Sequence, residues 1–268
     1  MAIRKRGSDW SDAHIRAFWA NFAANPHKSG QYFSKLVAAE LVTLLRLTGC
    51  LRGRILDYGC GPGYLLEKLV EQPVECWGMD FSAESVRECE RRVAGRRNWH
   101  GAVAIDRLPT PFPDASFDTV TCVETIEHLT DEHLSSTLKE LRRLVAPAGS
   151  VLLTTPHAED LDAAMIFCPF CDSEFHRVQH VRSWTGESLR KALKGAGFAH
   201  VETHAIDLNE LCLTPRQRRF WHPDVLPRAI RARVGALMDT INRPPPGFNR
   251  ELRALSRSGP HLYAIARP

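Results

Sequence analysis

The chain has 268 residues, of which 44% are hydrophobic and 25% charged, which is the composition of an ordinary globular protein. Lys and Arg number 35 against 31 Asp and Glu, and the net charge of +4 is too mild to indicate a dedicated nucleic-acid binder. Eight cysteines are too few for a secreted disulfide scaffold, and no segment has the pattern of an export signal or a membrane span. We therefore expect a cytoplasmic protein with no membrane partner.

Helices and strands are expected to alternate along most of the chain. Apolar spacing predicts two helices over 9–24 and 31–48, before the first strand. The expected strands are 54–58, 74–80, 103–105, 117–123, 150–155, 200–206 and 261–266, and the helices between them are 64–70, one that begins near Ser82, 131–145 and 187–194. This alternation predicts an α/β fold whose mostly parallel sheet carries helices on both faces.

Two stretches interrupt the alternation. Residues 156–184 carry a Cys/His cluster, and residues 207–259 form an arginine-rich insertion with helical patterning around 226–241. We expect an N-terminal helical lid at 1–49, a core at 50–206 that includes the Cys/His loop, a helical insertion at 207–259 and a last core strand at 260–268. The insertion could cap the core or form a homodimer surface. Its arginines could bind a phosphate or RNA, but such a run is more often a solvated helix face, so RNA is not favoured.

A glycine-rich turn follows the first strand, in the run Asp57-Tyr58-Gly59-Cys60-Gly61-Pro62-Gly63. Glycines here let the backbone approach a ligand and turn into a helix whose N-terminus attracts negative charge. Strict alternation of the glycines differs from the GxGxxG fingerprint of dinucleotide sites, which disfavours an NAD-dependent oxidoreductase. The D-x-G-x-G-x-G pattern resembles motif I of the class I S-adenosylmethionine (SAM) methyltransferases.

The resemblance continues in chain order over about residues 50–206. Asp80 ends the second strand, where such enzymes place an acid on the ribose hydroxyls, and Asp106 precedes Leu108-Pro109-Thr110-Pro111-Phe112-Pro113-Asp114. Thr110 stands where the family usually has Leu, and Ala148 replaces a Gly of the turn before the fifth strand. The resemblance implies a Rossmann-like, seven-stranded doubly wound sheet with N-terminal helices and a helical insertion before the last strand. It assigns SAM contacts to Asp57, Gly59, Cys60, Gly61, Gly63, Asp80, Phe81, Asp106, Arg107 and Glu124.

A second motif, Glu124-Thr125-Ile126-Glu127-His128, follows the fourth strand. Ligands of an open α/β sheet bind beyond the carboxyl ends of its strands, so these side chains should lie near the methyl donor. They could hold a divalent ion, or His128 could act as a general base oriented by Glu124 or Glu127. The alternative without a catalytic or metal-binding role is that the glutamates are solvated and His128 only lines the pocket.

This E-x-x-E-H run resembles two methyltransferase subfamilies. One contains the ubiquinone-biosynthesis O-methyltransferases. The other contains the small-RNA 2′-O-methyltransferases, in which the two Glu and the His join a distant His around a metal. His180, shortly before Trp184-Thr185, corresponds to that distant His.

The Cys/His cluster has the spacing of a zinc site. Cys168, Cys171, His176 and His180 form C-x2-C-x4-H-x3-H, and thiolate and imidazole are the ligands that zinc prefers. A C-x-x-C redox pair and a loop without metal are the alternatives. His180 cannot serve both this zinc site and the Glu/His centre, so at most one of the two is right.

We expect a SAM-dependent methyltransferase that transfers a methyl group to a small-molecule or terminal hydroxyl acceptor. Its cofactors would be SAM and either zinc at the Cys/His loop or another divalent metal at the Glu/His site. The remaining alternatives are an N- or C-methyltransferase of a natural product, an RNA 2′-O-methyltransferase, and a non-catalytic zinc-stabilised binding module.

Overall fold

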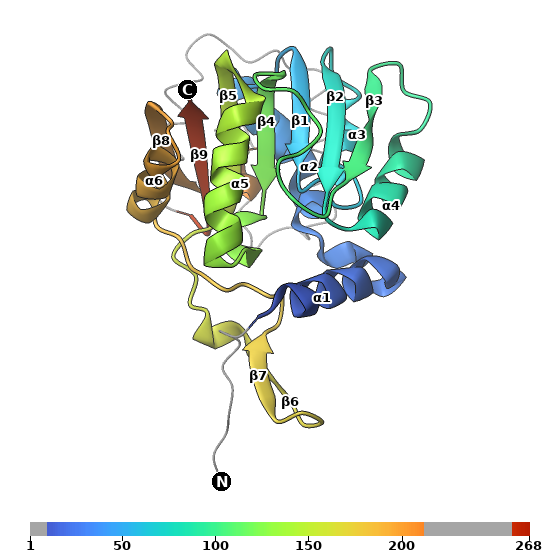
Figure 1. Cartoon of the computed structure of the whole chain (residues 1–268), viewed down its shortest axis with the longest axis vertical. Helices are drawn as coiled ribbons and strands as arrows, with labels where there is room; N and C mark the ends of the chain where they lie inside the picture. The colour runs from blue at the N-terminus through green and yellow to red at the C-terminus, as the bar shows by residue number, and fades with distance from the viewer. Residues whose placement is uncertain (1–9, 212–258) are drawn as a thin grey trace, which may run out of the picture.

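The computed structural model describes residues 10–211 and 259–268, and its centre is one seven-stranded sheet (Figure 1). The strand order is β3-β2-β1-β4-β5-β9-β8, and β9 runs antiparallel to both of its neighbours while the other pairs are parallel. The strands are β1 (Arg54–Tyr58), β2 (Glu75–Asp80), β3 (Trp99–Ala104), β4 (Phe117–Val123), β5 (Val145–Pro156), β8 (His200–Ile206) and β9 (His261–Arg267). The Rossmann-like fold expected from the sequence is confirmed.

Helices α1, α4 and α6 begin at a capping side chain. Ser82 accepts a hydrogen bond from Ser85 N at the start of α4, and Thr185 forms a capping box with Ser188 at the start of α6. The α-helices are α1 (Asp12–Ala24), α2 (Phe33–Leu47), α3 (Tyr64–Leu69), α4 (Ala83–Val93), α5 (Asp131–Leu144) and α6 (Gly186–Gly195), with short 3-10 turns η2 (Pro26–Gln31), η3 (Ile126–His128), η4 (Asp162–Ala164) and η5 (Leu208–Glu210). None of the described helices is long and apolar enough to cross a membrane.

Two apolar clusters hold the helices on opposite faces of the sheet. Successive strand residues point to opposite faces, so Ile55 packs with α2, α3 and α4 while Leu56 packs with α5 and α6. Both side chains are fully buried. This doubly wound arrangement leaves the carboxyl ends of the parallel strands on one edge of the sheet, and α1 lies across that edge (Figure 1).

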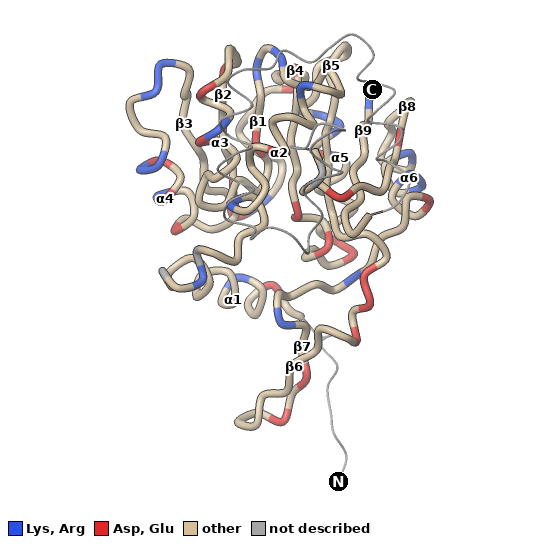
Figure 2. Tube along the Cα trace, turned by 180° about the vertical axis from the view of Figure 1, so that it is seen from behind, with Lys and Arg blue, Asp and Glu red and all other residues tan. Residues whose placement is uncertain are grey.

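The stretch between β5 and α6 contains a hairpin as well as loops. Strands β6 (Met165–Cys168) and β7 (Ser173–His176) pair antiparallel and project beyond α1, away from the sheet (Figure 1). Seen from behind, acidic positions mark the segment that leads to the hairpin (Figure 2). The sequence did not predict these two strands.

The late insertion lies mostly outside the described residues. Only its first five residues, including η5, and its last residue, Gly259, are described. The helix expected around 226–241, the arginines and the proposed homodimer surface all fall within 212–258, and they stay expectations.

Candidate functional site

A cavity of about 810 Å³ lies where the sequence places the methyl donor. Its walls come from α1, the stretch before α2, the glycine turn, the end of β2 and the start of the 124–128 segment. Eight of the ten residues expected to contact SAM line this cavity, namely Gly59, Cys60, Gly61, Asp80, Phe81, Asp106, Arg107 and Glu124. Most of the residues that the sequence assigned to one binding site therefore lie around one cavity in the structure.

The glycine turn is fastened to the end of β2. Gly59 and Gly61 adopt left-handed backbone angles, with φ of 77° and 51°, which favour glycine. Gly61 N donates to Asp80 Oδ2 at 2.9 Å, and Ser82 N donates to Asp80 Oδ1 at 2.8 Å. Each carboxylate oxygen can accept a second hydrogen bond, so Asp80 has the capacity to hold a vicinal diol in the cavity.

Asp57 and Gly63 do not line the cavity. Asp57 is buried behind the turn, where Thr121 Oγ1 donates to its Oδ1 at 2.7 Å, and burial raises its pKa to about 7. Gly63 has a φ of 82°, and a Cβ on it would lie 2.7 Å from Cys89 Sγ. Both residues shape the turn from behind, and the structure places neither against the ligand space.

The loop after β3, which carries Asp106 and Arg107, is tied to helix α5. Arg143 donates to the carboxylate of Glu140, to Asp114 Oδ1 and to the carbonyl oxygen of Phe112. Thr110 N and Oγ1 both donate to Glu140 Oε1, at 2.8 and 2.7 Å. This gives a physical reason for Thr110 at a position where the resemblance expects leucine: its hydroxyl joins a buried polar network.

The two glutamates of the 124–128 segment have different surroundings. Glu124 follows β4 with a φ of 44°, lines the cavity and accepts a hydrogen bond from Thr154 Oγ1 at 2.9 Å. Burial raises its pKa to about 8. Glu127 lies in η3 with its side chain fully buried, and its Oε2 accepts from Thr155 Oγ1 at 3.1 Å while its Oε1 has no hydrogen-bond partner. Burial and the neighbouring Glu124 raise the pKa of Glu127 well above its ordinary value.

His128 is held as a neutral imidazole. Its Nδ1 lies 3.3 Å from the carbonyl oxygen of Gln179, and since a carbonyl only accepts, Nδ1 carries the proton and Nε2 the lone pair. Burial lowers the pKa of His128 to about 3. Its Nε2 lies 3.7 Å from Glu127 Oε1, and its ring meets the Trp19 ring of α1 edge on, with centroids 4.8 Å apart.

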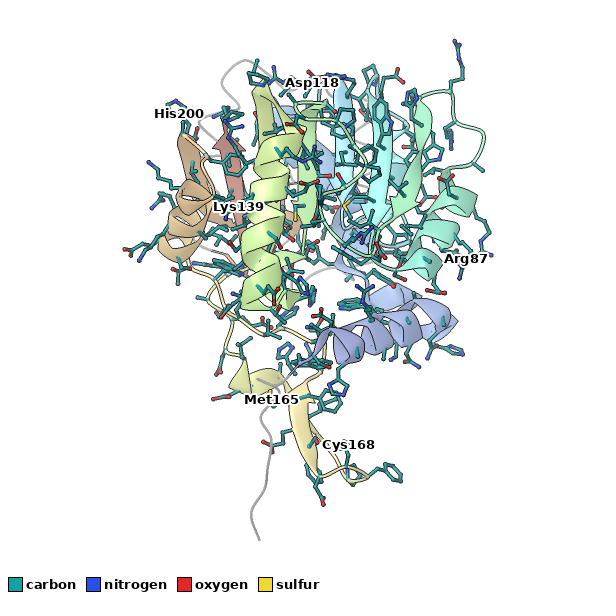
Figure 3. The ribbon with its side chains drawn as sticks, viewed as in Figure 1. Arg87, Asp118, Lys139, Met165, Cys168 and His200 are labelled. Carbon is teal, nitrogen blue, oxygen red and sulfur yellow. The ribbon has the colours of Figure 1, made fainter. Side chains whose placement is uncertain are left out.

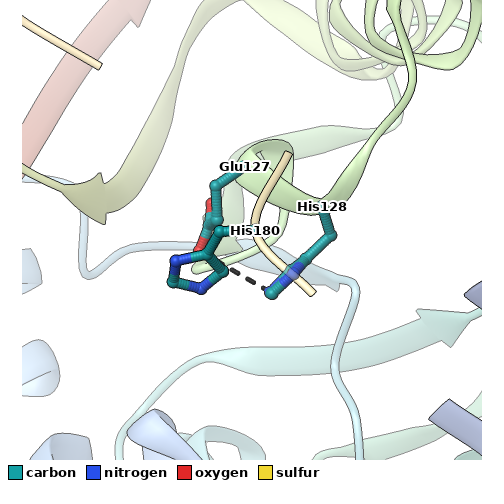
Figure 4. Close-up of side chains that lie close together, drawn as sticks. All are labelled: Glu127, His128 and His180. Carbon is teal, nitrogen blue, oxygen red and sulfur yellow. Dashed lines mark ion pairs between the residues drawn. The ribbon is translucent and has the colours of Figure 1, made fainter. Parts of the chain in front are cut away.

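His180 joins Glu127 and His128 from a distant part of the chain. Figure 4 shows the carboxylate and the two imidazoles together, with His180 on a separate segment. Their ligand atoms all lie within 4.8 Å of one another, so these three side chains could hold a metal ion. Among the described residues Glu124 is not part of that group. Glu159, His176 and His180 form a second group of the same kind.

The structure does not bring the four residues of the expected Cys/His zinc site together, because the hairpin separates Cys168 from His176. Cys168 pairs with Ser173 and His176 with Met165, which places them about 10 Å apart along the strands. Zinc needs its ligand atoms within about 4 Å of one another. Cys168 lies toward the far end of the hairpin (Figure 3), and it and Cys171 are free thiols. Hydrogen bonds from the backbone of Phe170 and Cys171 lower the pKa of Cys168.

Two site residues, Gln179 and Glu159, were not predicted from the sequence. Gln179 is fully buried, and its Nε2 donates to the carbonyl oxygen of His128 while its Oε1 accepts from Trp19 Nε1. The backbone of Gln179 has a φ of 62°, and no local sequence pattern predicts this conformation. Glu159 contacts both His176 and His180. The one feature of the sequence that could have indicated Glu159 is its position just beyond the carboxyl end of the fifth strand.

Comparison with known proteins supplies the family. The sequence model of a family described as "Methyltransferase domain" matches residues 26–203. The chain is 32% identical over 104 residues to a "Ubiquinone biosynthesis O-methyltransferase" of Idiomarina loihiensis, covering 38% of this chain and 42% of the relative. It is 30% identical over 175 residues to a "Probable S-adenosylmethionine-dependent methyltransferase" of Mycolicibacterium smegmatis, covering 63% of each. The chain thus spans less than two thirds of the length of these curated relatives.

Solved structures resemble the chain over almost its whole length. A chain of a complex between the Haloferax volcanii Trm112 methyltransferase activator and a methyltransferase superposes with a TM-score of 0.59 at 19% identity, and the match covers 93% of this chain and 96% of that one. DhpI in complex with SAH gives a TM-score of 0.58 at 19% identity and covers 97% and 98%. At such identities the likeness establishes the shared fold.

Proposed function

This chain belongs to the class I SAM-dependent methyltransferases, and from that premise we propose that it methylates a hydroxyl group of a small-molecule acceptor. SAM supplies an electrophilic methyl group. The chain's own residues must hold the donor, place the acceptor oxygen beside it and help remove the hydroxyl proton. The partial likeness to ubiquinone O-methyltransferases supports an oxygen acceptor.

The cluster of Glu127, His128 and His180 carries the proposal. A buried imidazole whose pKa is lowered to about 3 is a poor proton acceptor near neutral pH, which speaks against His128 as the general base. The same neutral ring is a good metal ligand. Glu127 Oε1, buried and without a hydrogen-bond partner, is a group that a cation would satisfy.

We therefore assign Glu127, His128 and His180 as ligands of a divalent cation. A cation held there would lower the pKa of an acceptor hydroxyl. Glu124 lines the cavity, and its pKa of about 8 suits a carboxylate that takes up a proton near neutral pH. Of the two alternatives left open by the sequence, this proposal takes the divalent ion and not the general base at His128.

Measurements of SAM affinity test the part of the proposal that concerns the methyl donor. We expect Gly61→Arg and Asp80→Ala to abolish SAM binding measured by calorimetry, because the first fills the approach to the turn and the second removes the carboxylate that faces the cavity. Unchanged affinity in both variants would reject the SAM site. Methyl transfer from labelled SAM to a panel of phenols and alcohols, with amines as controls, then tests the acceptor atom.

Elemental analysis of protein purified without chelator tests the cation. We expect metal that is lost in Glu127→Ala and in His128→Ala and is retained in Cys168→Ser. The reverse outcome would place the metal at the hairpin thiols. If none of the proteins, the wild type included, holds metal after dialysis against Zn²⁺, Mn²⁺ or Mg²⁺, the cation proposal is wrong.

A further inference from the structure

Glu159 contacts two imidazoles beside the proposed cation site. Its Oε2 lies 2.5 Å from His180 Nδ1, and its Oε1 lies 3.4 Å from His176 Nε2. The three side chains are close enough for a metal, yet the hydrogen bonds around them determine where each proton lies.

The proton on His176 argues against a metal at this second group. His180 N donates to His176 Nδ1 at 3.1 Å, so Nδ1 of the neutral ring holds a lone pair and Nε2 holds the proton. The Nε2 atom that faces Glu159 therefore has no lone pair to offer a cation. Hydrogen bonds therefore join His180 to both Glu159 and His176, while His176 Nε2 lies 3.4 Å from Glu159 Oε1 without a hydrogen bond.

The same contacts determine the tautomer of His180. A carboxylate only accepts hydrogen bonds, so His180 Nδ1 donates its proton to Glu159 and the lone pair stays on Nε2. The His180 ring is also confined between two others. It stacks on His176 with centroids 4.6 Å apart and an interplanar angle of 16°, and it meets His128 at 4.9 Å.

We propose that Glu159 is the positioning residue that holds His180 in its Nδ1-protonated tautomer and keeps the Nε2 lone pair available to the site of Glu127 and His128. Histidines that bind metals commonly donate their other ring proton to a carboxylate, which orients the ring and raises its basicity. The use of that lone pair for a cation rests on the proposed function. The tautomer itself does not.

The first test is carried out on metal-free protein. In ¹⁵N-histidine-labelled protein, two-bond proton–nitrogen spectra report the tautomer of each ring, and His180→Gln assigns the His180 signal. We expect the Nδ1-protonated form in the wild type and loss of that form in Glu159→Ala. Glu159→Gln keeps one carbonyl acceptor and should retain part of it, while Asp160→Asn alters the exposed neighbouring carboxylate and should change nothing.

The second test measures Mn²⁺ binding by calorimetry. We expect Glu159→Ala to weaken binding by about 10- to 100-fold and Glu159→Gln to weaken it less. SAM affinity should stay unchanged in the Glu159 and Asp160 variants and shows that they are folded. An Nε2-protonated His180 in the wild type, or a tautomer that survives Glu159→Ala, overturns the proposal. If the wild type binds no Mn²⁺, the cation assignment fails, and the tautomer spectra still decide the role of Glu159.

Discussion

Asp57 is a carboxyl group that the fold buries just behind the ligand space. Burial is the largest cause of its pKa of about 7, the hydrogen bond from Thr121 opposes the shift, and the nearby charge of Asp80 adds to it. A carboxyl with a raised pKa in the folded state binds its proton more tightly there than in the unfolded chain. Its contribution to stability is thus complete below its ordinary pKa of 3.8 and is lost as pH rises through about 7.

We expect Asp57→Asn to become more stable relative to the wild type as pH rises from about 4 to about 8, because Asn does not ionise. Its amide oxygen can still accept the hydrogen bond from Thr121. Melting temperatures of both proteins, measured without SAM across that range, provide the check. A difference that stays constant with pH would mean that Asp57 is not the buried titrating group described here.

Gly63 has a steric reason to be glycine. It combines a positive φ with a position where a Cβ would lie 2.7 Å from Cys89 Sγ and 3.1 Å from Cys89 Cα. We expect Gly63→Ala to lower the free energy of unfolding by about 2 to 4 kcal/mol, from backbone strain and overpacking together. Urea unfolding followed by circular dichroism measures this change.

Gly95→Ala is the matched control for that variant. Gly95 also has a positive φ, of 76°, but a Cβ there would meet nothing within 4 Å. Gly95→Ala should lower the free energy of unfolding by about 1 kcal/mol, from backbone strain alone. If the two variants lose equal stability, contact with Cys89 is not what excludes a side chain at position 63.

At the scale of elements, the loop after β3 depends on helix α5 for its shape. Arg143 reaches the loop from α5 and pairs with Glu140, whose side chain is 5% exposed. Replacing Arg143 by Met would leave that carboxylate buried without its partner, so we expect Arg143→Met to lower stability by about 2 to 4 kcal/mol.

SAM affinity should fall about tenfold in the same variant, because the loop that carries Asp106 and Arg107 loses its attachment. Calorimetry and thermal melting measure the two effects. Arg142→Met is the control, since Arg142 donates only to the carbonyl oxygen of Gly197 near the surface. Equal effects of the two variants would show that the network around Glu140 does not hold the loop.

The elements themselves could mostly be predicted from local pattern. Strands β1, β4 and β8 match their predicted bounds, and a glycine or an acidic residue directly follows each of them. Strand β5 is longer than predicted and begins at Val145, directly after α5, because the Ala146-Pro147-Ala148-Gly149 run, which resembles a turn, continues the strand. The β6–β7 hairpin was missed because its residues have no clear alternation.

The candidate site could be predicted only in part. The glycine turn, Asp80 and the 124–128 segment lie at successive strand ends, so order along the chain was enough to bring them together. His176 and His180 were assigned to the cysteines by spacing in sequence. In the structure their neighbours are Glu159 and the 124–128 segment, because the hairpin carries the cysteines away. Gln179 and Glu159 act through long-range contacts that no spacing reveals.

For the whole molecule, the position of the insertion predicts that it can be removed. Strand β8 pairs with β9 from Ile206 opposite His261, so the chain leaves the sheet and returns to it at neighbouring residues. We expect a protein in which a short Gly/Ser linker replaces residues 212–258 to fold and to bind SAM within about threefold of the wild type, because closure of a short loop there costs little. Calorimetry and thermal melting test this, and an unfolded product would show that 212–258 supports the sheet.

The position of the antiparallel last strand also determines which segment of the chain can vary without a change of fold. Since β9 completes the sheet after the longest interruption of the chain, material between β8 and β9 can be exchanged without altering the order of the strands or the turn at Gly61. The segment of a homologue could then replace this one as a single contiguous piece, with the donor site left in place. A chimaera spliced at 211 and 259 is the natural design for such an exchange.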